Sequence, residues 1–168
     1  YADVIQNIGI VKANKSEFDS ADYYFHLSKD IREALYETGD QRLKSFYLNY
    51  AYFMHLLNDV ETSLKYNKLA ESLFLKQSNP NQGIYARLLL NIGNNYYLQN
   101  DFDKAAVYYR NAINAFTQAN SEISLVTLAK NNLAIVNILG GNYEEAIKLL
   151  LEINGYELSV STKAKVLK

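Results

Sequence analysis

The stretch LLLNIGNNYYLQNDFDKAAVYYRNAINAF, residues 88–116, places small residues among bulky ones on both sides of a polar break. Before the break, apolar residues recur at three- and four-residue steps through Leu89, Ile92 and Tyr96, which is the periodicity of one helix face. Two antiparallel helices approach closely only where one presents Gly, Ala or Ser to a large side chain of the other. The stretch therefore predicts a helical hairpin in which Gly93 of the first helix and Ala105 of the second each make room for large side chains of the other helix.

The same hairpin occurs four times along the chain. The segment NDFDKAA has counterparts in KSEFDSA, NDVETSL and GNYEEAI, and the step between successive copies is 42, 42 and 41 residues. Three columns of equivalent residues keep this step: Phe18, Val60, Phe102 and Tyr143; Ala21, Ser63, Ala105 and Ala146; and Gly9, Ala51, Gly93 and Ala134. A unit of two helices is too small to bury its apolar face alone, so neighbouring units must stack on one another.

Breaks in the helical pattern divide the chain into units. They lie at Gly39, at the segment around Pro80, at residues 118–122 and at Asn154–Gly155. The expected units are 2–40, 41–82, 83–120 and 121–155, followed by the start of a further helix at 156–168. We expect one all-α domain of antiparallel helix pairs spanning residues 1–168. Because the chain begins at Tyr1 and stops inside a fifth unit, we expect it to be a fragment of a longer protein.

A cap-like column precedes each second helix: Ser16, Asn58, Asn100 and Gly141. Acidic residues follow three positions later: Asp19, Glu61, Asp103 and Glu144. A polar N-cap followed by an acid at this distance is the pattern of a capping box. The paired acids of these segments are therefore interpreted as helix caps rather than as catalytic carboxylates.

The repeat resembles the tetratricopeptide repeat. The third unit matches that motif best, through Leu89, Ile92–Gly93, Tyr96, Ala105, Tyr109 and Ala112. The second unit departs from it furthest, with Tyr50–Ala51, Met54, Ser63, Asn67 and Ala70. The resemblance implies a right-handed superhelix of helix pairs, and the long period implies helices longer than those of the usual repeat of about 34 residues. Units of this length are similar to those of bacterial peptide-sensing regulators, of repeat regions attached to bacterial sensor kinases and transcription factors, and of kinesin light chains.

An asparagine column lies two residues before each small residue of the first helices: Asn7, Asn49, Asn91 and Asn132. In the family that the repeat resembles, this position faces a concave groove and its carboxamide hydrogen-bonds the backbone of an extended peptide. An amide side chain offers a donor and an acceptor, so it suits a peptide unit. The alternative is that these side chains bridge neighbouring helices within the protein.

The same register adds further candidate groove residues: Tyr52, His55, Arg87, Asn94 and Tyr97. Arg87 can bind a ligand carboxylate or phosphate, or form a surface ion pair. Tyr52 and Tyr97 carry rings with a polar tip, a type enriched at binding hot spots, although core packing explains them equally well.

Composition narrows the function classes. The chain has no cysteine and two histidines without ligand spacing, so we expect no metal site and no cofactor. A formal net charge of -1 and the lack of a phosphate-binding loop argue against nucleic-acid binding by this domain and against an enzyme. The sequence has no run of about 20 apolar residues, so we expect no membrane insertion by this fragment. Many tyrosines and no tryptophan are typical of AT-rich bacterial coding, and the compartment stays open between cytoplasm and periplasm.

Two functional hypotheses follow. The first is a non-catalytic scaffold that binds a peptide or protein segment in a concave groove, as the ligand-sensing or interaction region of a larger bacterial signalling or regulatory protein. The second is a structural module that self-associates into a homo-oligomer and has no groove ligand. A third, an enzyme acting on a phosphorylated partner, requires a catalytic carboxamide or acid that the sequence does not identify.

Overall fold

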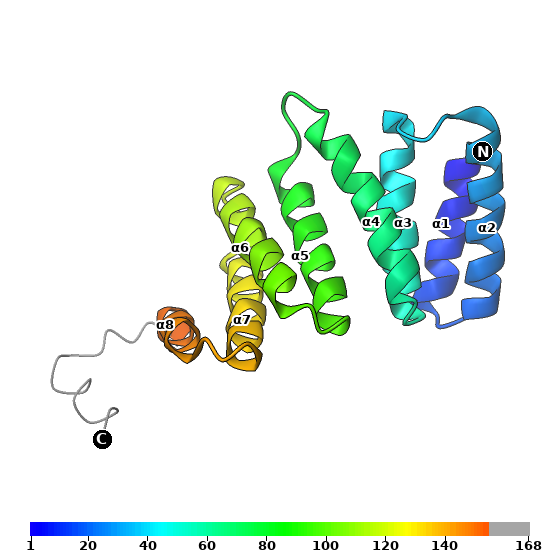
Figure 1. Ribbon diagram of the computed structural model, residues 1–168. Helices are drawn as coiled ribbons and strands as arrows, with labels where there is room; N and C mark the ends of the chain where they lie inside the picture. The colour runs from blue at the N-terminus through cyan, green and yellow to red at the C-terminus, as the bar shows by residue number, and fades with distance from the viewer. Residues whose placement is uncertain (155–168) are drawn as a thin grey trace, which may run out of the picture.

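The computed structural model describes residues 1–154, which form eight α-helices, one short 3-10 helix and no strand (Figure 1). The elements are α1 (Ala2–Asn14), α2 (Phe18–Leu35), η1 (Gln41–Leu43), α3 (Lys44–Leu56), α4 (Val60–Leu75), α5 (Gln82–Leu98), α6 (Phe102–Gln118), α7 (Ile123–Leu139) and α8 (Tyr143–Asn154). The all-α fold expected from the sequence is confirmed. The helix predicted to begin at 156–168 lies outside the described residues.

The helices are arranged as four hairpins in a row. α1 packs against α2, α3 against α4, α5 against α6 and α7 against α8, while α4–α5 and α6–α7 contacts join successive hairpins. Figure 1 shows the hairpin of the N-terminus at one end of the row and α8 at the other. Helix α2 stands upright in this view whereas α8 is seen end on, so the hairpins rotate along the row. The arrangement is an open superhelical stack and not a closed bundle.

Small residues permit the close approach of paired helices, as the sequence predicts. A Cβ built on Gly93 would lie 2.6 Å from two ring carbons of Tyr109 on the partner helix. The equivalent atom on Gly9 would lie 3.2 Å from the ring of Phe25. Ala105 of α6 has no exposed surface. The aromatic side chain therefore occupies the space that the glycine leaves free.

Aromatic residues fill the boundary between the first two hairpins. Across it, the rings of Phe25 and Phe53 stack with their centroids 4.7 Å apart, and the rings of Phe25 and Tyr50 lie 5.8 Å apart. Burial raises the pKa of Tyr50 to about 12, so its hydroxyl remains neutral at physiological pH. The buried core divides into two clusters, one mainly in α1–α4 and one in α5–α8.

The outer face of α1 carries an apolar stripe. Val4, Ile8 and Val11 are 61%, 38% and 53% exposed. The equivalent residues of the second hairpin are buried: Phe46, Tyr50 and Phe53. Within the described chain no earlier hairpin precedes α1, so this stripe remains in contact with solvent.

The turns between paired helices correct the capping prediction. Ser16, Asn58 and Asn100 each have φ of 60°, and Gly141 has φ of 79°. This left-handed conformation suits glycine and asparagine, so the column marks a tight turn and not the N-cap. In the second and third hairpins the residue after it caps the next helix: Asp59 Oδ1 accepts from the Thr62 amide at 3.0 Å and Asp101 Oδ1 from the Lys104 amide at 3.2 Å. The acidic residues expected next in sequence do lie in the first turns of α2, α4, α6 and α8.

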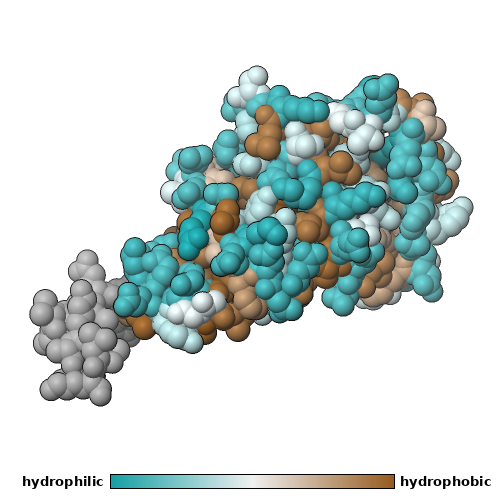
Figure 2. Space-filling model, viewed as in Figure 1, coloured by the Kyte–Doolittle hydropathy of each residue, from teal (hydrophilic) through white to brown (hydrophobic). Residues whose placement is uncertain are grey.

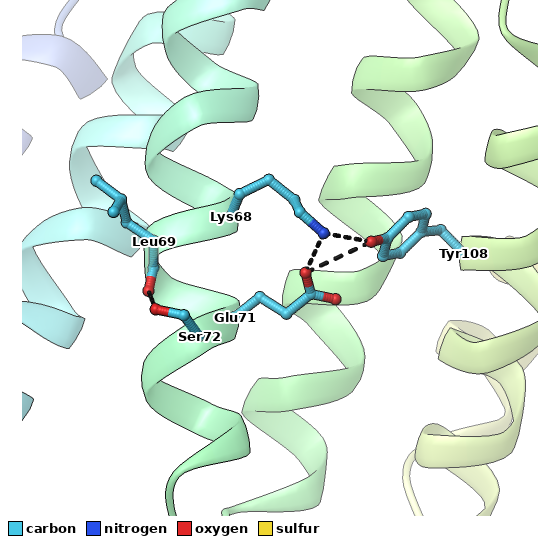
Figure 3. A network of polar contacts seen from close by, with 5 residues as sticks. All are labelled: Lys68, Leu69, Glu71, Ser72 and Tyr108. Carbon is cyan, nitrogen blue, oxygen red and sulfur yellow. Dashed lines mark hydrogen bonds and ion pairs between the residues drawn. The ribbon is translucent and has the colours of Figure 1, made fainter. Parts of the chain in front are cut away.

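A polar network joins the second and third hairpins (Figure 3). Lys68 on α4 donates to Glu71 and, at 2.6 Å, to the hydroxyl of Tyr108 on α6. That hydroxyl also donates to Glu71 Oε2 at 3.4 Å. Although burial opposes the charged form, these hydrogen bonds raise the pKa of Lys68 above its usual value, so the ammonium group stays charged. The network fixes α4 relative to α6.

Arg32 has the corresponding role inside the first hairpin. It is 3% exposed, and its Nη2 donates to Asp3 Oδ1 at 2.7 Å and to Gln6 Oε1 at 2.9 Å. Its guanidinium lies 5.4 Å from the centre of the Phe46 ring on α3. Arg32 therefore connects α2 with α1 and with the next hairpin.

Candidate functional site

Two neighbouring cavities lie where α3, α5 and α7, the first helices of three successive hairpins, follow one another. The larger, here the apolar cavity, has a volume of about 240 Å³ and is lined by His55, Asn94, Tyr97, Leu98, Tyr109, Asn132 and Ile135. The smaller, here the amide cavity, has a volume of about 150 Å³ and is lined by Ala51, Tyr52, His55, Ser63, Asn67, Asn91, Asn94 and Asn95. Because they share His55 and Asn94, the two cavities are adjacent.

Six of the nine candidate residues from the sequence line these cavities: Tyr52, His55, Asn91, Asn94, Tyr97 and Asn132. They come from α3, α5 and α7, so the superhelical stacking brings one repeated face together. The other three line neither cavity. Asn7 on α1 and Arg87 on α5 are exposed, and Asn49 on α3 is partly exposed.

Asn94 is the centre of the hydrogen bonding in the apolar cavity. Its Oδ1 accepts from the Tyr109 hydroxyl at 2.9 Å and from Asn132 Nδ2 at 3.1 Å. These bonds tie α5 to α6 and to α7. Burial, with a smaller contribution from Tyr97, raises the pKa of Tyr109, which keeps its hydroxyl a neutral donor.

The asparagine column divides between its two interpretations. Asn132 bridges neighbouring helices through Asn94, as the alternative interpretation holds, although it also lines the apolar cavity. Asn91 lines the amide cavity, and within residues 1–154 no side-chain hydrogen bond engages its carboxamide. Asn91 thus presents a free donor and a free acceptor at the cavity.

Buried polar residues at the amide cavity were absent from the sequence-based set. Ser63, Asn67 and Asn95 are only 1%, 2% and 1% exposed. Asn95 Nδ2 donates to Ser63 Oγ at 3.1 Å, whereas Oδ1 of Asn67 and Oδ1 of Asn95 have no hydrogen-bond partner. The sequence held one signal for them. The second unit departs from the repeat and has Asn67 where two other units have an aromatic ring, Phe25 and Tyr109.

The cavities carry almost no charge. Apart from His55, none of the residues that line them has an acidic or basic side chain. The arrangement offers hydrogen-bond donors and acceptors beside apolar surface, which is the chemistry of a recognition site. On the face shown in Figure 2, hydrophilic side chains cover most of the surface and apolar residues appear between them.

No group of three histidine or acidic side chains in residues 1–154 is placed to hold a metal ion. Among the described helices, none is long and apolar enough to cross a membrane.

Comparison with known proteins identifies the fold. No protein-family model matches the chain, and no curated protein matches it. Among solved structures, BtubC (BKLC) from P. vanneervenii has a TM-score of 0.77 at 17% identity, over 94% of this chain and 66% of that one. The STAND signal transduction ATPase with a tetratricopeptide repeat sensor from Pyrococcus horikoshii also gives 0.77 at 17% identity, over 92% of this chain and 23% of that one.

A third similar structure is the Rap conjugation gene regulator of plasmid pLS20 in complex with the Phr* peptide. It has a TM-score of 0.69 at 17% identity, over 91% of this chain and 41% of that one. This chain therefore spans between 23% and 66% of the length of the three solved proteins. At such identity the likeness shows the fold alone, which is that of the tetratricopeptide-like helical repeats.

Proposed function

We propose that the chain is a non-catalytic interaction module of the tetratricopeptide type, which binds a peptide or protein segment across the apolar and amide cavities. One observation carries the proposal. Repeated columns of carboxamide and aromatic side chains from α3, α5 and α7 converge on two adjacent, nearly uncharged cavities.

The side chains at this face suit an extended peptide. Each peptide unit offers one donor and one acceptor, and the unengaged carboxamide of Asn91 can bond both. Tyr52 and Tyr97 are 52% and 37% exposed, so their rings are available to a ligand. Exposed tyrosines beside a cavity are frequent anchors of protein interfaces because they add apolar area at a low cost in side-chain entropy.

The similar structures support a sensing role. One belongs to a regulator in complex with a peptide, and another belongs to a signalling ATPase with a repeat sensor. We infer that the chain serves as the interaction or ligand-sensing region of a larger bacterial regulatory protein.

Selection followed by calorimetry tests the proposal. A displayed library of random ten-residue peptides is selected on the immobilised chain, and the best peptide is titrated by isothermal calorimetry. Asn91→Ala combined with Asn132→Ala should weaken binding by about 10-fold or more, because buried peptide hydrogen bonds are lost. Asn114→Ala on the exposed face of α6 is the matched control and should change affinity less than about twofold. Failure to select any peptide, or equal effects of the two variants, would refute the groove.

Self-association is the second candidate, and the stripe of Val4, Ile8 and Val11 favours it. These residues stand in columns that are buried between hairpins elsewhere in the stack. A second copy of the chain could cover them. Light scattering at rising concentration should then show an oligomer that Val4→Asp with Val11→Asp abolishes. A constant monomer mass would eliminate this candidate.

A further inference from the structure

One boundary of the stack departs from the others in its composition. Two columns meet across each boundary between hairpins, one from a second helix and one from the following first helix. They hold Phe25 and Phe53 at the first boundary, Asn67 and Asn95 at the second, and Tyr109 and Val136 at the third. All six side chains are buried. Only the second boundary places two carboxamides where the others place apolar or aromatic groups.

This substitution opens the amide cavity. Asparagine is smaller than the phenylalanine and tyrosine that fill the same column in neighbouring units, and a volume of about 150 Å³ is left between α3, α4 and α5. A third change also introduces a polar group, since Ser63 replaces the alanine found in that column of the other three units. Three departures from the repeat therefore converge on one place.

The departure is unfavourable for folding. Asn67 Oδ1 and Asn95 Oδ1 are buried and accept no hydrogen bond, and an unsatisfied buried acceptor loses the solvation it has in the unfolded chain. A cavity adds the loss of packing contacts. Apolar residues at these positions, as at the other boundaries, would avoid both costs. A ligand that supplies the missing partners offsets them.

The chemistry of the cavity selects that ligand. A charged group would lose its hydration without meeting an opposite charge, because His55 is the only ionisable side chain besides Tyr52 at the cavity wall. An aliphatic group would leave both oxygens unpaired. A primary carboxamide carries two N–H donors and one acceptor, and it can pair with Asn67 and Asn95 in either orientation of their own amides.

We propose that the amide cavity is a subsite for the carboxamide side chain of a glutamine or asparagine in the bound segment, while the adjacent apolar cavity receives an apolar side chain of the same segment. This assignment rests on the proposed function, since it names the ligand chemistry of the same site. Leu98 and Ile135 supply the aliphatic wall of the apolar cavity.

Parallel selections test the subsite. Random ten-residue peptides are selected on the wild-type chain and on the variant Asn67→Leu/Asn95→Val. It places leucine opposite Ala51, as the fourth unit places Leu150 opposite Ala134, and valine as at Val136. The wild-type chain should enrich glutamine or asparagine at one peptide position, and the variant should lose that enrichment while keeping the apolar preference. Asn95→Val alone is a second, milder variant, with valine as at Val11 and Val136. These two chains are called the filled variants below.

Synthetic peptides then measure the preference. Replacing the enriched glutamine by glutamate or by methionine should weaken binding to the wild-type chain by about 10-fold or more, because each leaves buried oxygens unpaired. The same replacements should change binding to the filled variants by less than about twofold. The filled variants should also melt at a higher temperature than the wild-type chain.

The outcomes separate the two proposals. If the wild-type chain enriches no peptide, the proposed function fails and the subsite fails with it. If peptides are enriched without a carboxamide preference, or if the preference survives in both filled variants, the subsite alone is wrong. Enrichment of an acidic or basic residue at that position would also overturn it.

Discussion

Replacing Gly93 by alanine tests the packing rule on which the stack is built. The added Cβ would lie 2.6 Å from Cδ1 and Cε1 of Tyr109, a separation that real Cβ atoms essentially never show. Tyr109 is 1% exposed and its hydroxyl bonds Asn94, the residue next to the glycine. The ring cannot move without losing this hydrogen bond or displacing other core residues.

The expected effect is a net loss of stability. Overpacking costs about 1–3 kcal/mol, and a strained or lost hydrogen bond adds about 1 kcal/mol. Alanine returns about 1 kcal/mol through its better helix propensity. Gly93→Ala should therefore lower the free energy of unfolding by about 1–3 kcal/mol.

Two other helical glycines supply matched controls. A Cβ on Gly83 would meet only Asn81 Oδ1, at 3.5 Å, so Gly83→Ala should be neutral or stabilising by up to about 1 kcal/mol. A Cβ on Gly9 would lie 3.2 Å from the Phe25 ring, so Gly9→Ala should fall between the two. Urea denaturation followed by circular dichroism gives the order.

The double variant Gly93→Ala/Tyr109→Asn copies the small-residue and asparagine pair of the second unit, Ala51 and Asn67. If the clash is the cause, the alanine should be better tolerated when Tyr109 is absent. A Gly93→Ala variant as stable as Gly83→Ala, or a cost unchanged by removal of the tyrosine, would refute the reasoning.

Three further predictions concern stability. Arg32→Met should lower the free energy of unfolding by about 2 kcal/mol, because Gln6 loses its buried donor and Asp3 its ion pair, and urea denaturation measures the change. Asp101→Ala should destabilise the chain in urea denaturation because its carboxylate caps α6 at the Lys104 amide. Glu17→Ala, where no side-chain cap bond exists, should destabilise it less; equal losses would contradict the cap assignment. The side chain and then the backbone amide of Arg42 lower the pKa of Asp40 to about 2, so its contribution is present above its unfolded pKa of about 4 and is lost as the pH falls toward 2; the stability difference between wild type and Asp40→Asn should shrink over this window and stay constant above it.

The fold follows from the sequence because one geometric requirement is repeated four times. A small residue on each first helix has to face a larger one on its partner, and Gly93 with Tyr109 shows that the requirement is steric. Each recurrence adds independent support to the same period. The breaks predicted around Pro80 and at residues 118–122 coincide with the loops between α4 and α5 and after Gln118, because proline, asparagine and serine favour turns.

The role of the polar residue in each turn could not be predicted from its place in the repeat. A polar residue before a helix can be its N-cap or the left-handed residue of the preceding turn, and both roles favour asparagine. The choice depends on φ, which sequence spacing does not contain. The positive φ of Asn58 and Asn100 assigns them to the turn, and the neighbouring aspartates become the caps.

The candidate site was predictable in part. Asn94 lies about one helical turn after Asn91, a member of the asparagine column, so helix geometry places both on the same side of α5. The role of Tyr109 and the hydrogen bond between Asn132 and Asn94 required the structure, because they depend on how α5 packs against α6 and α7. Arg87 lines neither cavity, because it lies one turn nearer the start of α5 than Asn91 and its side chain is exposed there, between the buried Ala86 and Leu88.

Weakness of the repeat where the second unit meets the third has a physical interpretation beyond loss of pattern. The columns of Ser63, Asn67 and Asn95 hold other residues elsewhere in the chain. The first holds alanine, the second an aromatic residue or leucine, and the third an apolar residue. Where Ser63, Asn67 and Asn95 replace them together, the local free energy of folding is less favourable, and the three side chains meet around one cavity. Independent drift would scatter such changes over separate surfaces, whereas a requirement for polar contact concentrates them. The boundary between the second and third units is therefore the place where ligand recognition is to be tested first.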